Sequence, residues 1–414
     1  MRFSLIKKET GTLKKEGSPF EAPKEKAKQS ETKRILITGG HLTPAIAVSD
    51  ELTRKGFTNI IWIGHRHSQV MDKNDSAEYK YVAKKGLKFV ELKAGKLFRV
   101  WSADTLLPGL KALINIPVGF FQSIFILLKY KPSLVISFGG YLALPIVIGA
   151  FFLRIKRVTH EQTIVSGLSN RIIGKFVNKV FISWKYSEKY FNPKKTIFSG
   201  NPVRNSIFEV KGNSFSFESD RPTIYVTGGN QGSNVINQTV VPLLPTLLHE
   251  FNIIHQTGNS SVTEDFERCK AVKEKLEDSL ARRYIVKDYI YEDEIGDVMN
   301  RADIIIGRSG ANMCSEIMAL AKYSILIPIE VSSHNEQFLN AKALEELGLA
   351  KILLQKNLKT ESLNKSIYEV LRYKTMGLNL NGKKIETTIE KINKTIKNNS
   401  AEIIVSESLK LIDK

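Results

Sequence analysis

Residues 304–341 carry the most informative chemistry in this chain. An apolar run at residues 304–306 predicts a buried strand that ends at Gly307, and the small residues 309–311 begin a helix that carries Glu316. Such a turn leaves free backbone N–H groups and the positive end of a helix dipole at the C-terminal edge of a parallel sheet. The segment therefore predicts a site for a nucleotide diphosphate, with the carboxylate accepting from a ribose hydroxyl. An ordinary βαβ unit with tightly packed small residues has the same pattern, so that alternative stays open at this point.

A second candidate is the Thr-Gly-Gly-His turn at residues 38–41. It follows an apolar strand at residues 34–38 and precedes a helix with Pro44 in its first turn. The glycines allow a substrate to approach the backbone closely, and proline is tolerated where its missing N–H is not needed. His41 could take a proton near pH 7, which makes it a candidate general base. A purely structural turn would have the same strand–glycine–helix pattern.

Alternating strands and helices must position these residues. The first part of the chain has predicted strands at residues 34–38, 59–63, 88–92, 134–137, 157–159 and 180–183. After residues 220–222 the alternation restarts, with predicted strands at 223–227, 252–256, 283–286, 304–306 and 324–329, a glycine-rich turn at 228–233 and a helix at 234–250. This rhythm is typical of doubly wound sheets. We therefore predict an α/β protein with two Rossmann-like domains that face each other across a cleft, where ligands commonly bind.

The composition limits the classes of function. The 414 residues include 61 Lys and Arg against 42 Asp and Glu, a formal charge of +19 that attracts the phosphates of substrates, anionic lipids or nucleic acids. The cations are dispersed without interleaved aromatic residues, so nucleic acid is not a predicted partner. Two cysteines argue against a disulfide framework and fit a reducing cytoplasm. Seven scattered histidines lack metal-ligand spacing, so we predict neither a metal nor a cofactor.

Two segments differ from the rest of the chain. Residues 1–33 are rich in Lys, Glu, Ser, Gly and Pro, lack the apolar core of a signal peptide, and are predicted to form a disordered basic arm. Residues 106–128 are strongly apolar, but prolines and a lysine interrupt them, and the clean run at 118–128 is too short to cross a bilayer. Cations flank this run and the apolar run at 141–153. The pattern fits a helix resting on an anionic membrane surface, and it also fits a core helix packed on the sheet.

Further motifs occur in a fixed order, namely FGGYLALP (138–145), THEQ (159–162), GNPVR (200–204), VTGGNQGSNVINQ (226–238) and HQTG (255–258). Together with residues 304–341 they closely resemble the cell-wall glycosyltransferases that add N-acetylglucosamine (GlcNAc) to undecaprenyl-pyrophosphoryl-MurNAc-pentapeptide, converting lipid I to lipid II. The resemblance covers roughly residues 34–380. It implies a GT-B fold, an inverting transfer in peptidoglycan synthesis, UDP-GlcNAc as donor, a polyprenyl-pyrophosphate-linked acceptor, and a peripheral position on the cytoplasmic face of the cell membrane.

The alternation is interrupted between Ser199 and Asp220, where Pro202, Gly212 and polar residues occur, and this divides the chain. We predict an N-terminal domain (34–199), a linker (200–220), a C-terminal domain (221–385) and a helical tail (386–414), and the resemblance implies that the first domain faces acceptor and membrane and the second binds UDP-GlcNAc.

By similarity, residues along both domains would contact the donor. Arg204 and the glycine turn would face the phosphates, Ile290 the uracil, Glu316 the ribose, and Gln337 and Asn340 the sugar. The donor residues implied by the resemblance are Thr38, Gly39, Gly40, Thr163, Arg204, Gly229, Asn230, Gln231, Gly232, Ile290, Ser309, Gly310, Ala311, Asn312, Met313, Cys314, Ser315, Glu316, Gln337 and Asn340.

The acceptor cleft and the catalytic base are implied on the N-terminal side. Gly39, Gly40, His41, Tyr141 and His160 would line the acceptor site. Inverting transfer needs a base that deprotonates the acceptor hydroxyl, and His41 is the first candidate with Glu161 as its rival. A packed, second-layer histidine is the other interpretation of His160.

The chain departs from the family at several points. Members of the family usually have the sequence GGTGGH where this chain has Ile37-Thr38-Gly39-Gly40-His41. The loop expected to receive the acceptor pyrophosphate is therefore shorter in this chain. Thr163 replaces an asparagine of the family, Asn230 replaces a phosphate-facing serine, and Asn335-Glu336-Gln337 stands where the family has an aspartate ahead of a glutamine pair. These departures leave other functions open: a transferase with another acceptor, a UDP-sugar epimerase, or a membrane-recruited scaffold without activity.

Overall fold

The computed structural model describes residues 33–67, 75–92, 103–212, 215–218, 220–229, 231–258, 260, 262–330, 335–395 and 399–413. The predicted basic arm, apart from Lys33, lies outside the described residues. Residues 77, 103–116 and 393–395 are described by their backbone alone.

Among the described residues, seven parallel strands form the N-terminal sheet, in the order β3-β2-β1-β4-β5-β6-β7. These strands are β1 (Ile35–Thr38), β2 (Ile60–Gly64), β3 (Lys88–Glu91), β4 (Leu134–Ser137), β5 (Lys156–Glu161), β6 (Lys179–Ile182) and β7 (Thr196–Phe198). Side chains alternate along β1, so that Ile35 and Ile37 enter the core on one face and Leu36 the core on the other. Both faces are therefore covered, as a parallel sheet requires.

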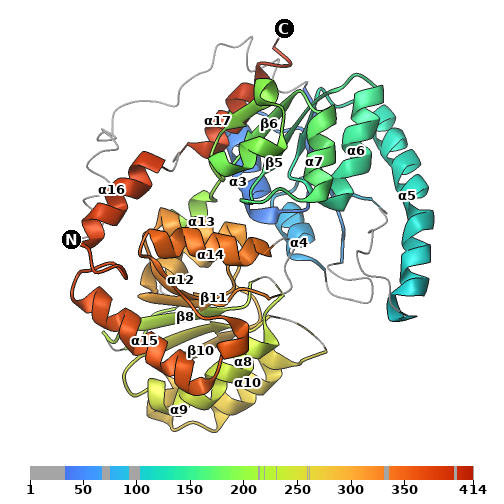
Figure 1. Ribbon diagram of the computed structural model, residues 1–414. Helices are drawn as coiled ribbons and strands as arrows, with labels where there is room; N and C mark the ends of the chain where they lie inside the picture. Colours follow the sequence, from blue (N-terminus) through green and yellow to red (C-terminus); the bar gives the residue numbers. More distant parts are fainter. Residues whose placement is uncertain are drawn as a thin grey trace.

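Helices cover the two faces of this sheet (Figure 1). On one face lie α3 (Leu42–Arg54) and α4 (Ala77–Lys84), and on the other α5 (Ala103–Tyr130) and α6 (Gly140–Phe152), with α7 (Leu168–Phe176) packed beside α6. Because β1 and β4 are neighbours, the turns that lead into α3 and α6 meet at one edge of the sheet.

The C-terminal sheet has the same design. Within the described part of the chain it contains six parallel strands in the order β10-β9-β8-β11-β12-β13. These strands are β8 (Thr223–Thr227), β9 (Asn252–Gln256), β10 (Tyr284–Lys287), β11 (Ile304–Gly307), β12 (Tyr323–Leu326) and β13 (Ala350–Ile352). Its helices are α8 (Asn234–Val240), α9 (Leu244–Leu247), α10 (Asp265–Glu274), α11 (Asp278–Ala281), α12 (Ile295–Arg301), α13 (Ala311–Ala319), α14 (Glu336–Glu346) and α15 (Thr360–Thr375).

The chain crosses between the domains twice. Residues 200–220 leave the N-terminal sheet, and Ile207 and Phe215 from this linker pack into the C-terminal core. At the other end, α16 (Ile385–Thr395) places Ile392 in the C-terminal core, whereas α17 (Ser400–Leu409) returns to the N-terminal domain and packs Ile404 beside α3 (Figure 1). The predicted helical tail is thus divided between the two domains.

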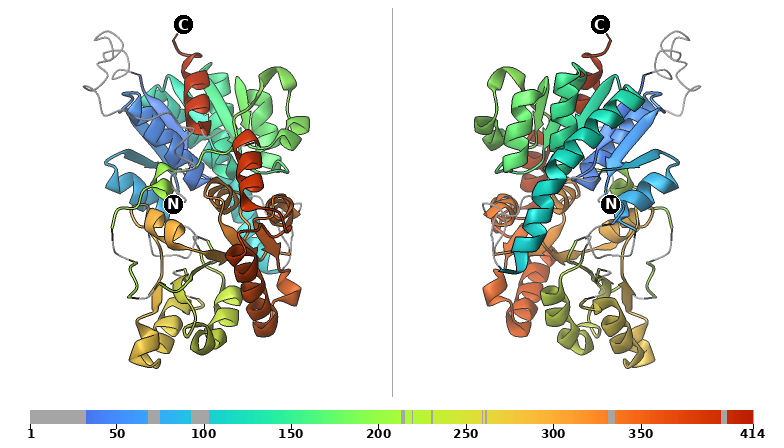
Figure 2. Two further views of the ribbon diagram at one scale, coloured as in Figure 1. Left: turned by 90° about the vertical axis from the view of Figure 1, so that its left-hand side faces the viewer. Right: turned by 90° about the vertical axis from the view of Figure 1, so that its right-hand side faces the viewer.

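The two-domain α/β architecture predicted from the sequence is confirmed, and three local expectations change. The helix expected at 234–250 is broken into α8, a short 3-10 turn and α9, because Pro242 and Pro245 cannot continue an α-helix. The short strands β7 and β13 were not predicted. At residues 103–130 the structure has one continuous helix, α5, that runs along the outer side of the N-terminal domain (Figure 2). None of the helices in the described ranges is long and apolar enough to be a candidate membrane span.

Candidate active site

The predicted donor edge is formed where β11 ends and α13 begins. Gly310 is the N-cap of α13 in extended conformation, and the N–H of Cys314 is the first to bond back to it. The N–H groups ahead of Cys314 therefore point from the helix end, where an anion is favoured. The side chains of Cys314 and Ser315 are buried, and Ser315 Oγ bonds to the Ala311 carbonyl. A contact from Cys314 or Ser315 to a donor phosphate would therefore not come from their side chains.

A largely buried ion pair fixes the carboxylate predicted to hold the ribose. Arg204 Nε lies 2.8 Å from Glu316 Oε1, and Arg204 Nη1 lies 2.9 Å from Glu292 Oε2. Burial alone would lower the pKa of Arg204, but the charges and hydrogen bonds of the two carboxylates raise it above its usual value. Glu316 is 2% exposed, so this pair orients it firmly at the donor edge. The structure thus brings together Arg204 and Glu316, which lie 112 residues apart.

The glycine turn after β8 is held by close backbone contacts. Gly229 (φ +83°) accepts the N–H of Gly232 at 3.1 Å, and its own N–H donates to Thr227 Oγ1. A Cβ on Gly232 would come within 2.0 Å of the Thr257 carbonyl, so only glycine fits there. Gln231 is exposed beside this turn, whereas Asn230 lies outside the described residues.

The remaining residues predicted to bind the donor differ in which polar groups they have available for hydrogen bonds to a ligand. Gln337 Oε1 accepts the N–H of Ile329 (3.1 Å), and Asn340 Nδ2 donates to the Ser309 carbonyl (3.1 Å). Asn340 Oδ1 and Ser309 Oγ are buried without a protein partner. Ile290 is 2% exposed within the C-terminal core, so a uracil contact there would have to come from its main chain.

Two glycine turns meet at the predicted acceptor edge. A Cβ on Gly40 would come within 2.5 Å of the Gly139 carbonyl, which shows that the turns after β1 and β4 are in direct contact. Gly40 (φ +124°) and Gly140 (φ +80°) have conformations that favour glycine. Helices α3 and α6 begin there, so two positive helix ends serve one position, an arrangement suited to a diphosphate. Tyr141 is half-buried in the first turn of α6, with its ring 5.7 Å from that of His65.

The two candidate bases, His41 and Glu161, differ in how far hydrogen bonds already occupy their side chains. His41 is the half-buried N-cap of α3, and burial lowers its pKa while the charge of Glu161 acts in the opposite direction. Glu161 Oε1 accepts from the N–H (2.9 Å) and hydroxyl (2.7 Å) of Thr163, and Oε2 from Ser166 Oγ (2.7 Å) and Asn170 Nδ2 (3.0 Å). Because a carboxylate has about four acceptor positions, Glu161 is fully engaged. His41 is the less engaged of the two.

His160 and Thr163 act inside the N-terminal domain. His160 is 0% exposed, and its Nε2 lies 3.2 Å from the Gly200 carbonyl and 3.1 Å from Ser183 Oγ. Burial lowers the pKa of His160 to about 3, so its ring is neutral at pH 7. Its placement favours the packed interpretation over direct acceptor contact. Thr163 is likewise buried and bonded to Glu161, which puts its predicted donor contact in doubt.

Comparison with known proteins shows which family the chain belongs to. Residues 38–182 match the glycosyltransferase family 28 N-terminal domain, and residues 223–400 match the glycosyltransferase family 28 C-terminal domain. A UDP-N-acetylglucosamine–N-acetylmuramyl-(pentapeptide) pyrophosphoryl-undecaprenol N-acetylglucosamine transferase from Clostridium botulinum (strain Langeland) is 30% identical over 377 residues, which are 88% of this chain and 99% of the relative. The chain belongs to this transferase family.

Solved structures agree with the GT-B fold of this transferase. The crystal structure of MurG from Acinetobacter baumannii is similar with a TM-score of 0.60 and 21% identity, covering 91% of this chain and 99% of the other. UDP-GlcNAc 2-epimerase from Neisseria meningitidis, solved with UDP-GlcNAc bound, is similar with a TM-score of 0.58 and 13% identity, covering 91% and 99%. The fold alone therefore does not distinguish a transferase from an epimerase.

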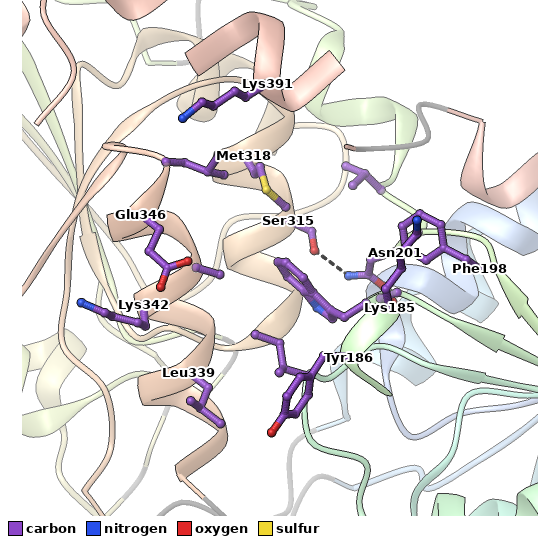
Figure 3. Close-up of a pocket in the computed structure, with 17 residues that line it drawn as sticks. Lys185, Tyr186, Phe198, Asn201, Ser315, Met318, Leu339, Lys342, Glu346 and Lys391 are labelled. Atoms are coloured by element: carbon purple, nitrogen blue, oxygen red, sulfur yellow. Dashed lines mark hydrogen bonds between the residues drawn. The ribbon is translucent and has the colours of Figure 1, made fainter. Parts of the chain in front are cut away.

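A cavity of about 1140 Å³ lies between the domains of the transferase, beside the linker (Figure 3). Asn201 from the linker donates to Ser315 Oγ (2.8 Å), and both Trp184 of the N-terminal domain and Leu339 of the C-terminal domain line the cavity. Ser315, predicted to contact the donor, thus takes part in the contact between domains, whereas Arg204, Glu316 and His41 do not line the cavity.

Three acidic residues of the site were not predicted from the sequence. Glu292 shares Arg204 with Glu316, Glu78 lies against Gly39, and Glu336 begins α14 facing the charge of Glu161. Burial, with the charge of Glu161, raises the pKa of Glu336 to about 7. Only Glu336 could have been noticed in the sequence, because it replaces a glutamine of the family. Glu78 and Glu292 reach the site through contacts between segments that are distant in the sequence.

We predict that Glu316→Gln weakens donor binding selectively. The amide removes the charge that Arg204 balances and one acceptor for the ribose, so the Kd for UDP-GlcNAc should rise about tenfold or more in calorimetric titration. The KM for a lipid I analogue should change much less. Glu345→Gln, on the partly exposed side of α14, is the matched control. Equal losses for both substrates would contradict the placement of Glu316 in the donor site.

Proposed function

We propose that this transferase moves GlcNAc from UDP-GlcNAc to the MurNAc unit of undecaprenyl-pyrophosphoryl-MurNAc-pentapeptide in peptidoglycan synthesis. The observation that carries the proposal is the pair of anion-favouring edges, one in each domain, in a chain of this transferase family. The C-terminal edge has the N-terminus of α13 and the Arg204–Glu316 pair for a nucleotide diphosphate. The N-terminal edge has the starts of α3 and α6 for a lipid-linked diphosphate.

Unpaired buried polar atoms support the same two edges. Thr38 Oγ1 lies at the end of β1, and Ser309 Oγ and Asn340 Oδ1 lie beside the start of α13, all without a protein partner. Buried polar atoms are costly unless a ligand or water completes their hydrogen bonds. These three residues are therefore suited to contact substrate hydroxyl or phosphate groups.

In the proposed mechanism, His41 is the base. The acceptor hydroxyl oxygen attacks C1 of GlcNAc while its proton passes to the neutral imidazole, and the bond from C1 to the UDP oxygen breaks. Arg204 and the helix end at α13 stabilise the charge that develops on UDP. Glu161 is held by four donors, and its charge favours the imidazolium that forms on His41. Its role is electrostatic, since none of its acceptor positions remains for the acceptor's proton.

The outer face of the N-terminal domain supports a peripheral position at an anionic membrane surface. Phe121 and Phe125 on α5 are 71% and 64% exposed, and Phe152 on α6 is 65% exposed. Lys129 and Arg154 are exposed at the ends of these helices. We call these five residues the α5–α6 patch. Exposed aromatic rings bordered by cations are typical of surfaces that rest on anionic lipid, where the acceptor's polyprenyl chain would be anchored.

The transferase and epimerase functions can be separated by one assay. With UDP-GlcNAc and a lipid I analogue, we expect UDP release that requires the acceptor, measured by a coupled assay. Release of UDP without acceptor, or conversion of UDP-GlcNAc to its C2 epimer by NMR, would contradict the transferase. No turnover under either condition would favour the scaffold.

The pH dependence of kcat tests His41. Because burial lowers its pKa, His41 is neutral and basic at pH 7, and kcat should fall as the pH drops through a value below 6.5. His41→Ala should lower kcat by roughly 10²–10⁴ and remove this acid limb. His249→Ala, an exposed histidine, is the control. An acid limb that persists in His41→Ala would show that another group is the base.

Vesicle sedimentation tests the α5–α6 patch. The protein should pellet with phosphatidylglycerol vesicles at low salt, and Phe121→Asp with Phe125→Asp should abolish this because two charges would enter the lipid interface. Val262→Asp replaces a residue that is 87% exposed on the C-terminal domain and serves as control. Wild-type protein that remains in the supernatant would contradict membrane docking.

A further inference from the structure

The shortened loop after β1 rests on a carboxyl group that comes from another part of the chain. Glu78 lies in the first turn of α4, with its side chain directed under the ends of β1 and β2. A Cβ on Gly39 would lie 1.6 Å from Glu78 Oε1, and a Cβ on Gly64 would lie 2.5 Å from Oε2. Trp62 Nε1 donates to Oε1 at 2.6 Å and fixes the carboxyl group there.

These contacts show how closely Glu78 packs against Gly39 and Gly64. A Cβ at either position would meet the carboxyl group of Glu78, which would then have to leave the place where Trp62 holds it. The side chain of Glu78, from α4, lies directly against the start of the short loop that follows β1. In this chain the loop at residues 39–41 therefore rests on the carboxyl group of Glu78.

We propose that Glu78 is a positioning residue for the acceptor: its carboxyl group supports the loop at residues 39–41, and its charge sets the loop's affinity for the acceptor diphosphate. The inference deepens the proposed function and rests on it. Glu78 acts from behind the loop through Gly39, and the loop in turn contacts the substrate.

The environment of Glu78 lets its charge change near neutral pH. Burial raises the pKa of Glu78 to about 7, while hydrogen bonds from Trp62 and the main chain of His65 partly offset this. Below pH 7 the group is mostly neutral and leaves the positive helix ends free to attract a diphosphate. Above pH 7 it carries a negative charge close to the same position, so acceptor affinity should fall as the pH rises.

Neighbouring ionisable groups do not account for such a change. Burial lowers the pKa of His65, near Glu91, and of His41, so both rings lose their protons below pH 6.5. Burial and the charge of Glu78 raise the pKa of Tyr141, which stays protonated. The acceptor diphosphate is a diester and has no ionisation in this range. Burial and the charge of Glu161 also raise the pKa of Glu336 to about 7, but Glu78→Gln leaves Glu336 in place, so a pH dependence caused by Glu336 would persist in that variant.

The test is the KM for a lipid I analogue at pH 6 and pH 8, at saturating UDP-GlcNAc. In wild type it should rise about tenfold between these values, which is the effect of one nearby charge. In Glu78→Gln, which is neutral throughout, the ratio of the acceptor KM at pH 8 to that at pH 6 should be close to one, whatever the change in kcat. Glu91→Gln removes an exposed carboxylate from the same sheet edge and should keep the wild-type pH dependence.

A second variant guards against a folding defect in Glu78→Gln. Trp62→Phe removes the donor that favours the ionised carboxylate, so the rise in acceptor KM should move to higher pH. A purely structural support would not move this midpoint in a defined direction. A KM rise that persists unchanged in both variants would overturn the inference about Glu78 alone. Wild-type UDP release that ignores the acceptor would overturn the proposed function, and this inference with it.

Discussion

The site depends on the ion pairs that the largely buried guanidinium of Arg204 makes with Glu292 and Glu316. Arg204 follows the last strand of the N-terminal sheet, and both carboxylates belong to the C-terminal domain. Burying a charge is costly unless it is paired with good geometry, and here two carboxylates share one cation. The pair therefore ties the linker to the C-terminal domain and orients Glu316 at the edge where α13 begins.

Each domain offers groups that suit the phosphate of a different substrate. At the donor edge a positive helix end, a guanidinium and a carboxylate can hold a phosphate and a ribose together. At the acceptor edge two glycine turns, after β1 and β4, leave main-chain groups from α3 and α6 for a second phosphate group. His41 lies at the start of α3 on this edge. The proposed base therefore belongs to the N-terminal domain, which is also the domain proposed to bind the acceptor.

Most of the fold could be predicted from the sequence, because long apolar runs in parallel sheets are buried on both faces. The strands at 35–38 and 304–307 are clear examples. The short strands β7 and β13 were missed because each has only three residues, most of them half-buried, which leaves little pattern. The broken helix at 234–250 shows that two prolines outweigh an apolar period. The ordered motifs predicted a donor edge and an acceptor edge. They could not show that Ile290 and Cys314 turn inward, or that Glu78 lies under Gly39, because those facts depend on packing between distant segments.

The central claim is that the donor and acceptor bind on different domains. Hydrogen–deuterium exchange followed by peptide mass spectrometry measures this directly. UDP-GlcNAc alone should protect peptides covering residues 309–316, and a lipid I analogue alone should protect peptides covering residues 138–141. Protection of 138–141 by the donor alone, with none at 309–316, would contradict the account.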